Sequence, residues 1–240
     1  MIDTIVSFLL AAIPAILAIT LHEASHGYAA WALGDDTAKQ AGRLSLNPLV
    51  HVDRVGTILL PGFLLISQLL TIGHVGFMFG WAKPVPVAAW RFRDPRRGMM
   101  LVAAAGPLMN FVLAWLGGLA WHGLDQLPDA AQHATAEFLG AFILYNLVLG
   151  LFNLLPIPPL DGGRIVVGLL PLPAARVWAR TERAGIFIVL LLIYLVPPAL
   201  REVGIDFDPV RAAMNDVLPR AFDLVLRLSG NDSSGLDIGG

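Results

Sequence analysis

The sequence contains no cysteine among its 240 residues and few charged residues. Without cysteine, disulfide bonds, thiolate ligands for zinc and a cysteine nucleophile are excluded, so any metal must be held by His, Asp or Glu. Charged residues make up 14% of the chain, whereas soluble domains carry about 25%. Hydrophobic residues reach 56%. This composition predicts an integral membrane protein.

The charges that are present nearly balance. The net charge of −2 provides no basic surface of the kind that nucleic acids attract, so no nucleic-acid partner is expected. Residues 1–4 read MIDT and lack the basic residues that open a signal peptide, so cleavage is not expected there. The expected surroundings are a lipid bilayer, and the oligomeric state stays open.

Long apolar runs predict the architecture. About 20 apolar residues cross a bilayer as a helix. Runs that reach or approach this length cover 5–33, 99–121, 138–155 and 185–200, and a further helix is expected over 165–170. The predicted fold class is an all-α membrane protein, a polytopic helical bundle of about four to six transmembrane segments.

Two further segments depart from simple helical runs. Residues 57–72 are apolar but contain Pro61 and Gly62, so they either cross the bilayer or dip into it and return. Residues 80–87 are too rich in proline for a helix. They predict a short, membrane-associated extended or hairpin region.

The end of the first apolar run carries a short motif with catalytic potential. Residues 22–26 read HEASH, an HExxH motif. Residues i and i+4 share one face of a helix, so His22 and His26 can reach the same metal ion. Glu23 lies beside them, where it can take a proton from a water that the metal activates. Ionisable groups at membrane depth are costly, so the motif favours a zinc hydrolase built within a bilayer.

A catalytic zinc takes three protein ligands, and the motif helix supplies two. Asp161 is the best candidate for the third, because it follows a proline-rich break in an apolar segment and precedes Gly162 and Gly163. The alternative is that Asp161 caps the following helix. If Asp161 is not the ligand, His51 or Asp53 in the polar loop is next, although a solvated loop is the simpler interpretation of both.

Three motifs together resemble the site-2 protease family of intramembrane zinc metalloproteases. They are 22–26, the stretch 153–163 reading NLLPIPPLDGG, and 106–110 reading GPLMN. The resemblance implies one zinc per chain, two histidine ligands and a distant aspartate ligand, and a glutamate that activates the water. It also implies transmembrane protein substrates, often in regulated intramembrane proteolysis.

On this resemblance the implied ligands are His22, His26 and Asp161, and the implied base is Glu23. The chain is similar to a minimal bacterial member without a PDZ-like insertion between the motif helices. Residues 42–48 and 80–86 resemble linkers of compact bacterial members. A single metalloprotease domain is expected over 1–240.

Within that domain we expect a core over 5–200. The 206–228 tail mixes apolar and charged residues and is expected to be interfacial or packed on the bundle. Residues 231–240 are rich in Gly, Ser and Asp and are expected to be disordered.

Two asparagines lie within the apolar segments. Asn110 and Asn153 could bind the substrate backbone or the developing oxyanion. The alternative is a polar contact between helices.

Basic residues predict the orientation, because cytoplasmic loops are enriched in Lys and Arg. They cluster over 91–97 and 164–183, whereas 122–137 has none, which places 122–137 outside. The basic residues of 34–54 also favour the cytoplasm, and this location is compatible with the others only if 57–72 is re-entrant. The predicted location is the cell (inner) membrane, multi-pass, with the active site toward the cytoplasmic side.

The predicted function is hydrolysis of peptide bonds in or near transmembrane segments of membrane-protein substrates. Two other classes of protein would use the same residues. A metal-ion transporter would need several ligand sites along a path, and an inactive scaffold would only bind membrane helices.

Overall fold

The computed structural model of the protein describes residues 2–71, 73 and 80–231. Within these residues the regular elements are all helices, and no β-strand is formed. The all-α class predicted from the sequence is confirmed. Three described stretches are long and apolar enough to cross a membrane, namely Arg54–Thr71, Pro95–Gln126 and Ala131–Asn153.

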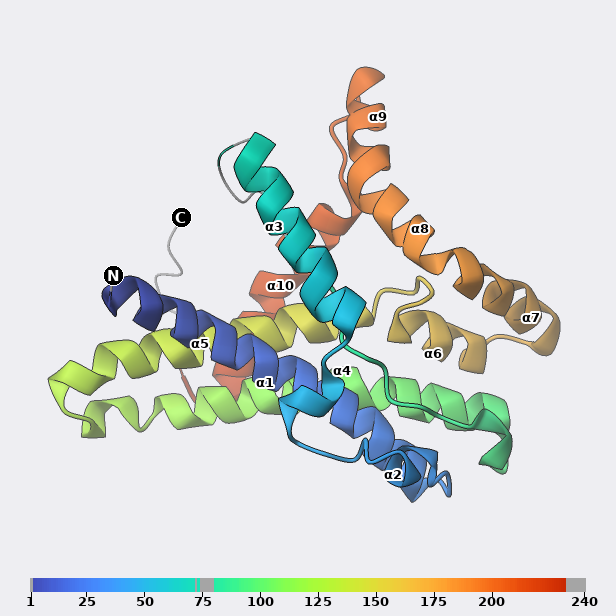
Figure 1. Ribbon diagram of the computed structural model, residues 1–240, viewed down its shortest axis with the longest axis horizontal. Helices are drawn as coiled ribbons and strands as arrows, with labels where there is room; N and C mark the ends of the chain where they lie inside the picture. Colours follow the sequence, from blue (N-terminus) through green and yellow to red (C-terminus); the bar gives the residue numbers. More distant parts are fainter. Residues whose placement is uncertain (1, 72, 74–79, 232–240) are drawn as a thin grey trace.

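Three long helices lie side by side and form the body of the molecule (Figure 1). They are α1 (Ile2–Ala32), α4 (Pro95–Trp121) and α5 (Asp129–Asn153). At about 1.5 Å per residue, each is longer than the roughly 30 Å hydrocarbon core of a bilayer. A short connection reverses the chain between α4 and α5, so α1 and α5 run in one direction and α4 in the other. The second half of α1, the first half of α4 and the end of α5 therefore meet.

The body is closed by the C-terminal helix α10 (Pro209–Leu228). Phe222, Val225 and Leu226 of this helix pack against Ile143 and Leu147 of α5 in a buried apolar cluster. These contacts correspond to the second of the two alternatives for the tail, packing on the bundle. Residues 232–240, for which disorder was predicted, lie outside the described residues.

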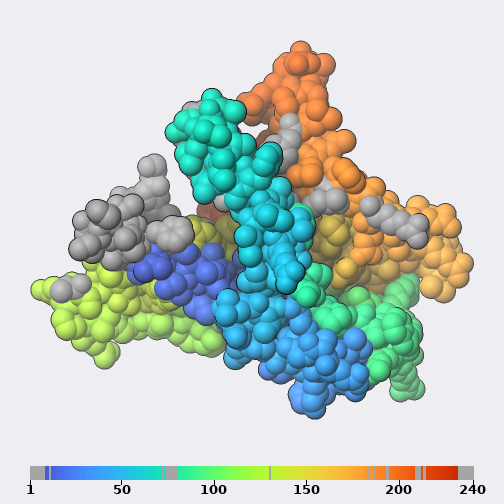
Figure 2. All heavy atoms as spheres, in the orientation of Figure 1, coloured from blue at the N-terminus to red at the C-terminus, as the bar shows by residue number. Residues whose placement is uncertain are grey.

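The apolar 57–72 segment belongs, as far as it is described, to one continuous helix that ends at Thr71 and projects from the bundle (Figures 1 and 2). A π-helical stretch (Arg54–Leu59) leads directly into α3 (Leu60–Thr71). The chain comes back beside the start of this helix, because the Trp81 N–H donates to the Gly56 carbonyl at 3.1 Å and the Thr57 hydroxyl donates to the Trp81 carbonyl at 2.9 Å. The chain therefore lies beside the start of this helix both before and after it, as the re-entrant interpretation requires.

Of the two alternatives for the proline-rich region, residues 80–88 follow the extended one and form neither a regular strand nor a hairpin. Pro84 and Pro86 have no N–H and cannot donate to a neighbouring strand. Residues 80–88, which we call the strap, run instead along α1.

The boundaries of two predicted spans also differ. Helix α5 begins at Asp129 rather than near residue 138, because an alanine-rich stretch with high helix propensity precedes the apolar run. The predicted 185–200 span is interrupted by a π-helical stretch over 191–195. Prolines at 197 and 198 follow this stretch.

The remaining elements are short and connect these helices. They are α2 (Thr37–Gln40), 3-10 turns at Pro48–His51, Ala89–Arg91, Leu124–Gln126 and Thr181–Ala184, α6 (Asp161–Leu169), α7 (Leu172–Arg180), α8 (Gly185–Leu190), the π-helix Leu191–Leu195 and α9 (Val196–Glu202). In the view of Figure 2, α8 and α9 form a second ridge that projects beside α3.

Candidate metal centre

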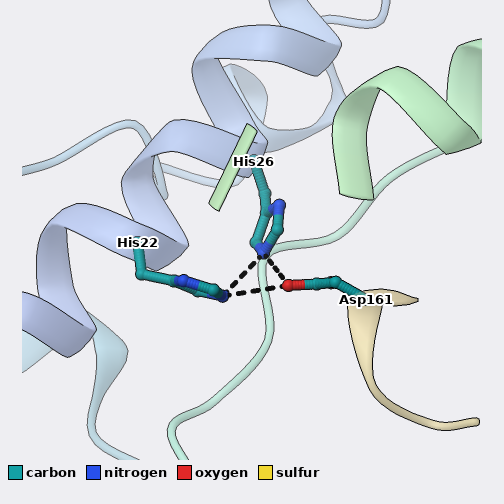
Figure 3. Close-up of side chains that lie close together, drawn as sticks. All are labelled: His22, His26 and Asp161. Atoms are coloured by element: carbon teal, nitrogen blue, oxygen red, sulfur yellow. Dashed lines mark hydrogen bonds and ion pairs between the residues drawn. The ribbon is translucent and has the colours of Figure 1, made fainter. Parts of the chain in front are cut away.

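Three side chains point toward a common position between α1 and the start of α6 (Figure 3). His22 Nε2 lies 3.1 Å from His26 Nε2, and Asp161 Oδ2 lies 3.1 Å from the first nitrogen and 3.3 Å from the second. In the part of the chain that the structure describes, this is the one group of three such side chains able to hold a metal ion.

The break before Asp161 brings this carboxylate to the histidines. Helix α5 ends at Asn153, and α6 begins at Asp161 itself. A Cβ on Gly162 would lie 2.3 Å from the carbonyl oxygens of both Leu154 and Leu155, so only glycine allows the chain to fold back this closely. The capping position of α6 is the residue before Asp161, and it makes no side-chain capping hydrogen bond, which disfavours the capping alternative.

Hydrogen bonds on the far sides of the two rings fix where their protons lie. His26 Nδ1 lies 2.7 Å from the Val102 carbonyl oxygen, and His22 Nδ1 lies 2.6 Å from Asn110 Oδ1. A carbonyl oxygen only accepts, so each Nδ1 must carry the proton. In a neutral imidazole the Nε2 atom then has a free lone pair. This is the arrangement in which histidine binds a metal.

Two nitrogen lone pairs and a carboxylate oxygen therefore face one another. Asp161 Oδ2 is buried and has no hydrogen-bond donor. These three electron-rich atoms repel one another unless positive charge lies between them. A divalent cation can accept a lone pair from all three at once, whereas a single proton cannot. Two imidazoles and one carboxylate match the three protein ligands of catalytic zinc sites. The residues present therefore fit a zinc ion.

Helix α4 closes the site at a glycine. A Cβ on Gly106 would lie 2.5 Å from His26 Cε1 and 2.6 Å from His22 Cε1. Only a residue without a side chain lets α4 pack directly against both rings, and this contact explains the glycine of the 106–110 motif.

Glu23 faces the strap. Its Oε2 accepts a hydrogen bond from the Val85 N–H at 3.2 Å. The backbone N–H of Val85 therefore orients one carboxylate oxygen of Glu23.

The strap is itself held by side chains and one backbone carbonyl of the 34–54 segment. Arg43 donates to the Lys83 carbonyl at 2.7 Å, and the Lys83 N–H donates to the His51 carbonyl at 2.8 Å. At the other end, the Ala88 N–H donates to Asp35 Oδ2 at 2.6 Å. These contacts fix the position along α1 at which the Val85 N–H donates to Glu23.

Asp35 is fully buried just beyond the end of α1. Burial raises the pKa of this carboxyl group, but hydrogen bonds from Thr37 and Ala88 and the charge of Arg91 outweigh burial and hold the pKa below its usual range. The carboxylate thus remains ionised and keeps its hold on the strap at neutral pH.

The other predicted residues lie in different surroundings. Asn110 uses its Oδ1 for His22 and its Nδ2 for Ala18 and Asn146, so the contacts favour the interhelical alternative over substrate binding. Asn153 donates to the Leu149 carbonyl in its own helix at 3.0 Å, and its binding role stays a prediction.

The two alternative ligands lie apart from the three converging side chains. His51 is buried against the Ser45 carbonyl, and Asp53 accepts from the N–H groups of Val55 and Gly56. Neither residue belongs to the metal-binding group.

Sequence reasoning missed three contributors to the site. They are Gly106 as a contact of the imidazoles, Val85 as the partner of Glu23, and Asn146 as a partner of Asn110. Asn146 alone carried a signal, because an amide inside an apolar run needs a partner.

Sequence comparison with known proteins finds relatives of this chain. The helical bundle and its His–His–Asp group are compatible with a membrane metalloprotease. Peptidase family M50 matches residues 121–196, which include Asp161. No solved structure matches the chain.

Two relatives carry names that describe them as candidate zinc metalloproteases. YwhC of Bacillus subtilis (strain 168) is 41% identical over 187 residues, which are 76% of this chain and 78% of the relative. Rip2 of Mycolicibacterium smegmatis is 32% identical over 191 residues, which are 78% of this chain and 66% of the relative. The chain belongs to peptidase family M50, the site-2 protease family, and is a zinc metalloprotease.

The glycine contact gives a direct prediction. Gly106→Ala places a methyl group against both imidazoles, so we expect zinc affinity to fall by about 10- to 100-fold, the range found when a ligand's support is disturbed. Zinc affinity is measured by competition with a chelator. The control is Gly140→Ala, where a Cβ meets nothing within 4 Å. Equal zinc affinities in the two variants would contradict the role of Gly106.

Proposed function

We propose that the protein is an intramembrane zinc metalloprotease that hydrolyses peptide bonds in or near transmembrane segments of membrane-protein substrates. His22, His26 and Asp161 hold the zinc, and Glu23 is the general base. The observation that carries the proposal is the convergence of two imidazole lone pairs and one carboxylate between helices of a membrane bundle. Charged and polar groups in such a position indicate function.

A bound zinc lowers the pKa of water and polarises the carbonyl of the scissile peptide. Glu23 takes a proton from that water as the water oxygen bonds to the carbonyl carbon. It then delivers the proton to the amide nitrogen as the carbon–nitrogen bond breaks. The Val85 N–H holds one oxygen of Glu23, which orients the carboxylate for the water.

The substrate must be unwound, because the hydrogen bonds of a helix shield its peptide groups. The strap offers an extended segment beside Glu23, along which an unwound substrate lies as an added chain. The proline-broken stretch 154–160 leads to Asp161 and gives water a route to the site. In this proposal Asn153, at the end of α5, contacts the substrate backbone.

The proposed membrane is the cell (inner) membrane, and residues 1–240 act as one domain with the active site toward the cytoplasm. The arrangement of the helices supports this orientation. The arginines of 91–97 lie just before α4 or in its first turn, and those of 164–183 follow α5. Both groups therefore belong to the end of the bundle that carries Asp161. The 122–128 connection lies at the opposite end.

Labelling of introduced cysteines tests this orientation. The chain has no cysteine of its own, so single cysteines at exposed positions 93 and 126 can be treated with an impermeant thiol reagent in intact cells. We expect labelling at 126 and none at 93. The reverse pattern would invert the orientation, and labelling at a cysteine placed within 34–54 would contradict the re-entrant path.

Replacement of the base separates metal binding from catalysis. Glu23→Gln keeps the size and the acceptor for Val85 but cannot take a proton. Zinc stoichiometry should stay at one per chain, while cleavage of a model transmembrane substrate falls at least about 100-fold, as expected for loss of a general base. The measurements are metal content and the initial rate of cleavage by the purified protein.

These two measurements, together with zinc transport into vesicles, distinguish the other functions. A wild-type protein that moves zinc across vesicles but cleaves nothing is a transporter. Zinc binding without cleavage or transport indicates a scaffold. Cleavage that survives in zinc-loaded Glu23→Gln would remove the general-base role.

A further inference from the structure

A chain of buried amides connects His22 to the backbone of α5. Asn110 Nδ2 donates to Asn146 Oδ1 at 2.9 Å, and Asn146 Nδ2 donates to the Phe142 carbonyl at 2.8 Å. Both asparagines are fully buried. The chain thus runs from α5 through α4 to α1, across the centre of the bundle.

The direction of every hydrogen bond in this chain follows from its last member. The Phe142 carbonyl can only accept, so Asn146 must present its N–H to it and its oxygen to Asn110. Asn110 must then present its own N–H to Asn146 and its oxygen to His22, and the Ala18 carbonyl at 3.3 Å favours the same orientation. His22 must therefore carry its proton on Nδ1.

The reverse orientation would disable the site. If the Asn110 amide turned over, its N–H would face His22 Nδ1, and the ring would carry its proton on Nε2 instead. That proton would occupy the position where the ring offers its lone pair. The orientation of one amide thus decides whether His22 can bind metal.

We propose that Asn146 is a positioning residue of the metal centre, acting through Asn110 to hold His22 in its metal-binding tautomer. The inference rests on the proposed function, since it takes His22 as a zinc ligand. Asn146 touches neither the metal group nor a substrate position. Its role is carried by two hydrogen bonds of fixed direction.

A double-variant experiment on the full-length protein tests the proposal. Asn146→Leu removes the partner that orients Asn110, and Asn110→Asp offers only acceptors and so cannot turn a donor toward His22. Zinc affinity is measured by chelator competition for both single variants and the double variant, with the melting temperature of the metal-free protein as a fold control. Thr135→Val, which removes a hydroxyl bonded within α5, is the matched polar-to-apolar control.

We expect Asn146→Leu to weaken zinc binding by about tenfold, the lower end of the effect of partners of metal ligands. In the Asn110→Asp background, Asn146→Leu should lower zinc affinity by less than about threefold, because the carboxylate accepts the Nδ1 proton of His22 without needing Asn146 to orient it. Thr135→Val should bind zinc as the wild type does.

Two results would overturn the inference. One is an unchanged zinc affinity in Asn146→Leu, and the other is an equal loss in both backgrounds, which would show that the substitution merely disturbs packing. His22→Ala reports on the proposed function separately. If His22→Ala keeps full zinc affinity, His22 is not a ligand and the proposed function fails. If His22→Ala loses zinc affinity while Asn146→Leu binds zinc as the wild type does, only the positioning role is rejected.

Discussion

The metal centre depends on two hydrogen bonds made behind the histidine rings. The Val102 carbonyl and Asn110 Oδ1 both accept, so the Nδ1 atoms of His26 and His22 donate and the opposite nitrogens face the carboxylate of Asp161 as lone pairs. Both acceptors belong to α4, the helix that runs against α1. The packing of one helix on another therefore sets the chemistry of the site, and the cluster demands a cation because its members repel one another without one.

The close packing around the metal centre explains why glycine is required at two positions of the bundle. Gly106 lets α4 reach the imidazoles, and Gly162 lets the break after α5 fold back until Asp161 arrives at the same position. Small residues allow close approach of helices in membranes generally. Here they also set distances between ligands, since a methyl group at either position would collide with a ring or with a backbone carbonyl.

Much of this followed from the sequence. The apolar runs predicted the helices, and the spacing of His22 and His26 predicted their shared face, because both depend on local periodicity alone. The break before Asp161 made this residue the best candidate for the third ligand but left a helix cap as the alternative, because the position of α6 relative to α1 depends on the packing of the helices. The partners of Glu23 and Asn110 lie 62 and 36 residues away in the chain, and no local pattern indicates such contacts. The start of α5 was missed because an alanine-rich stretch is helical without being strongly apolar.

X-ray absorption at the zinc edge of the purified, zinc-loaded protein tests the central claim most directly. The structure predicts two imidazole nitrogens and at least one carboxylate oxygen at about 2.0–2.2 Å from the metal. In Asp161→Ser the two imidazoles should remain while the carboxylate contribution is lost. A wild-type spectrum with one imidazole or three, or a spectrum that Asp161→Ser leaves unchanged, would contradict the account.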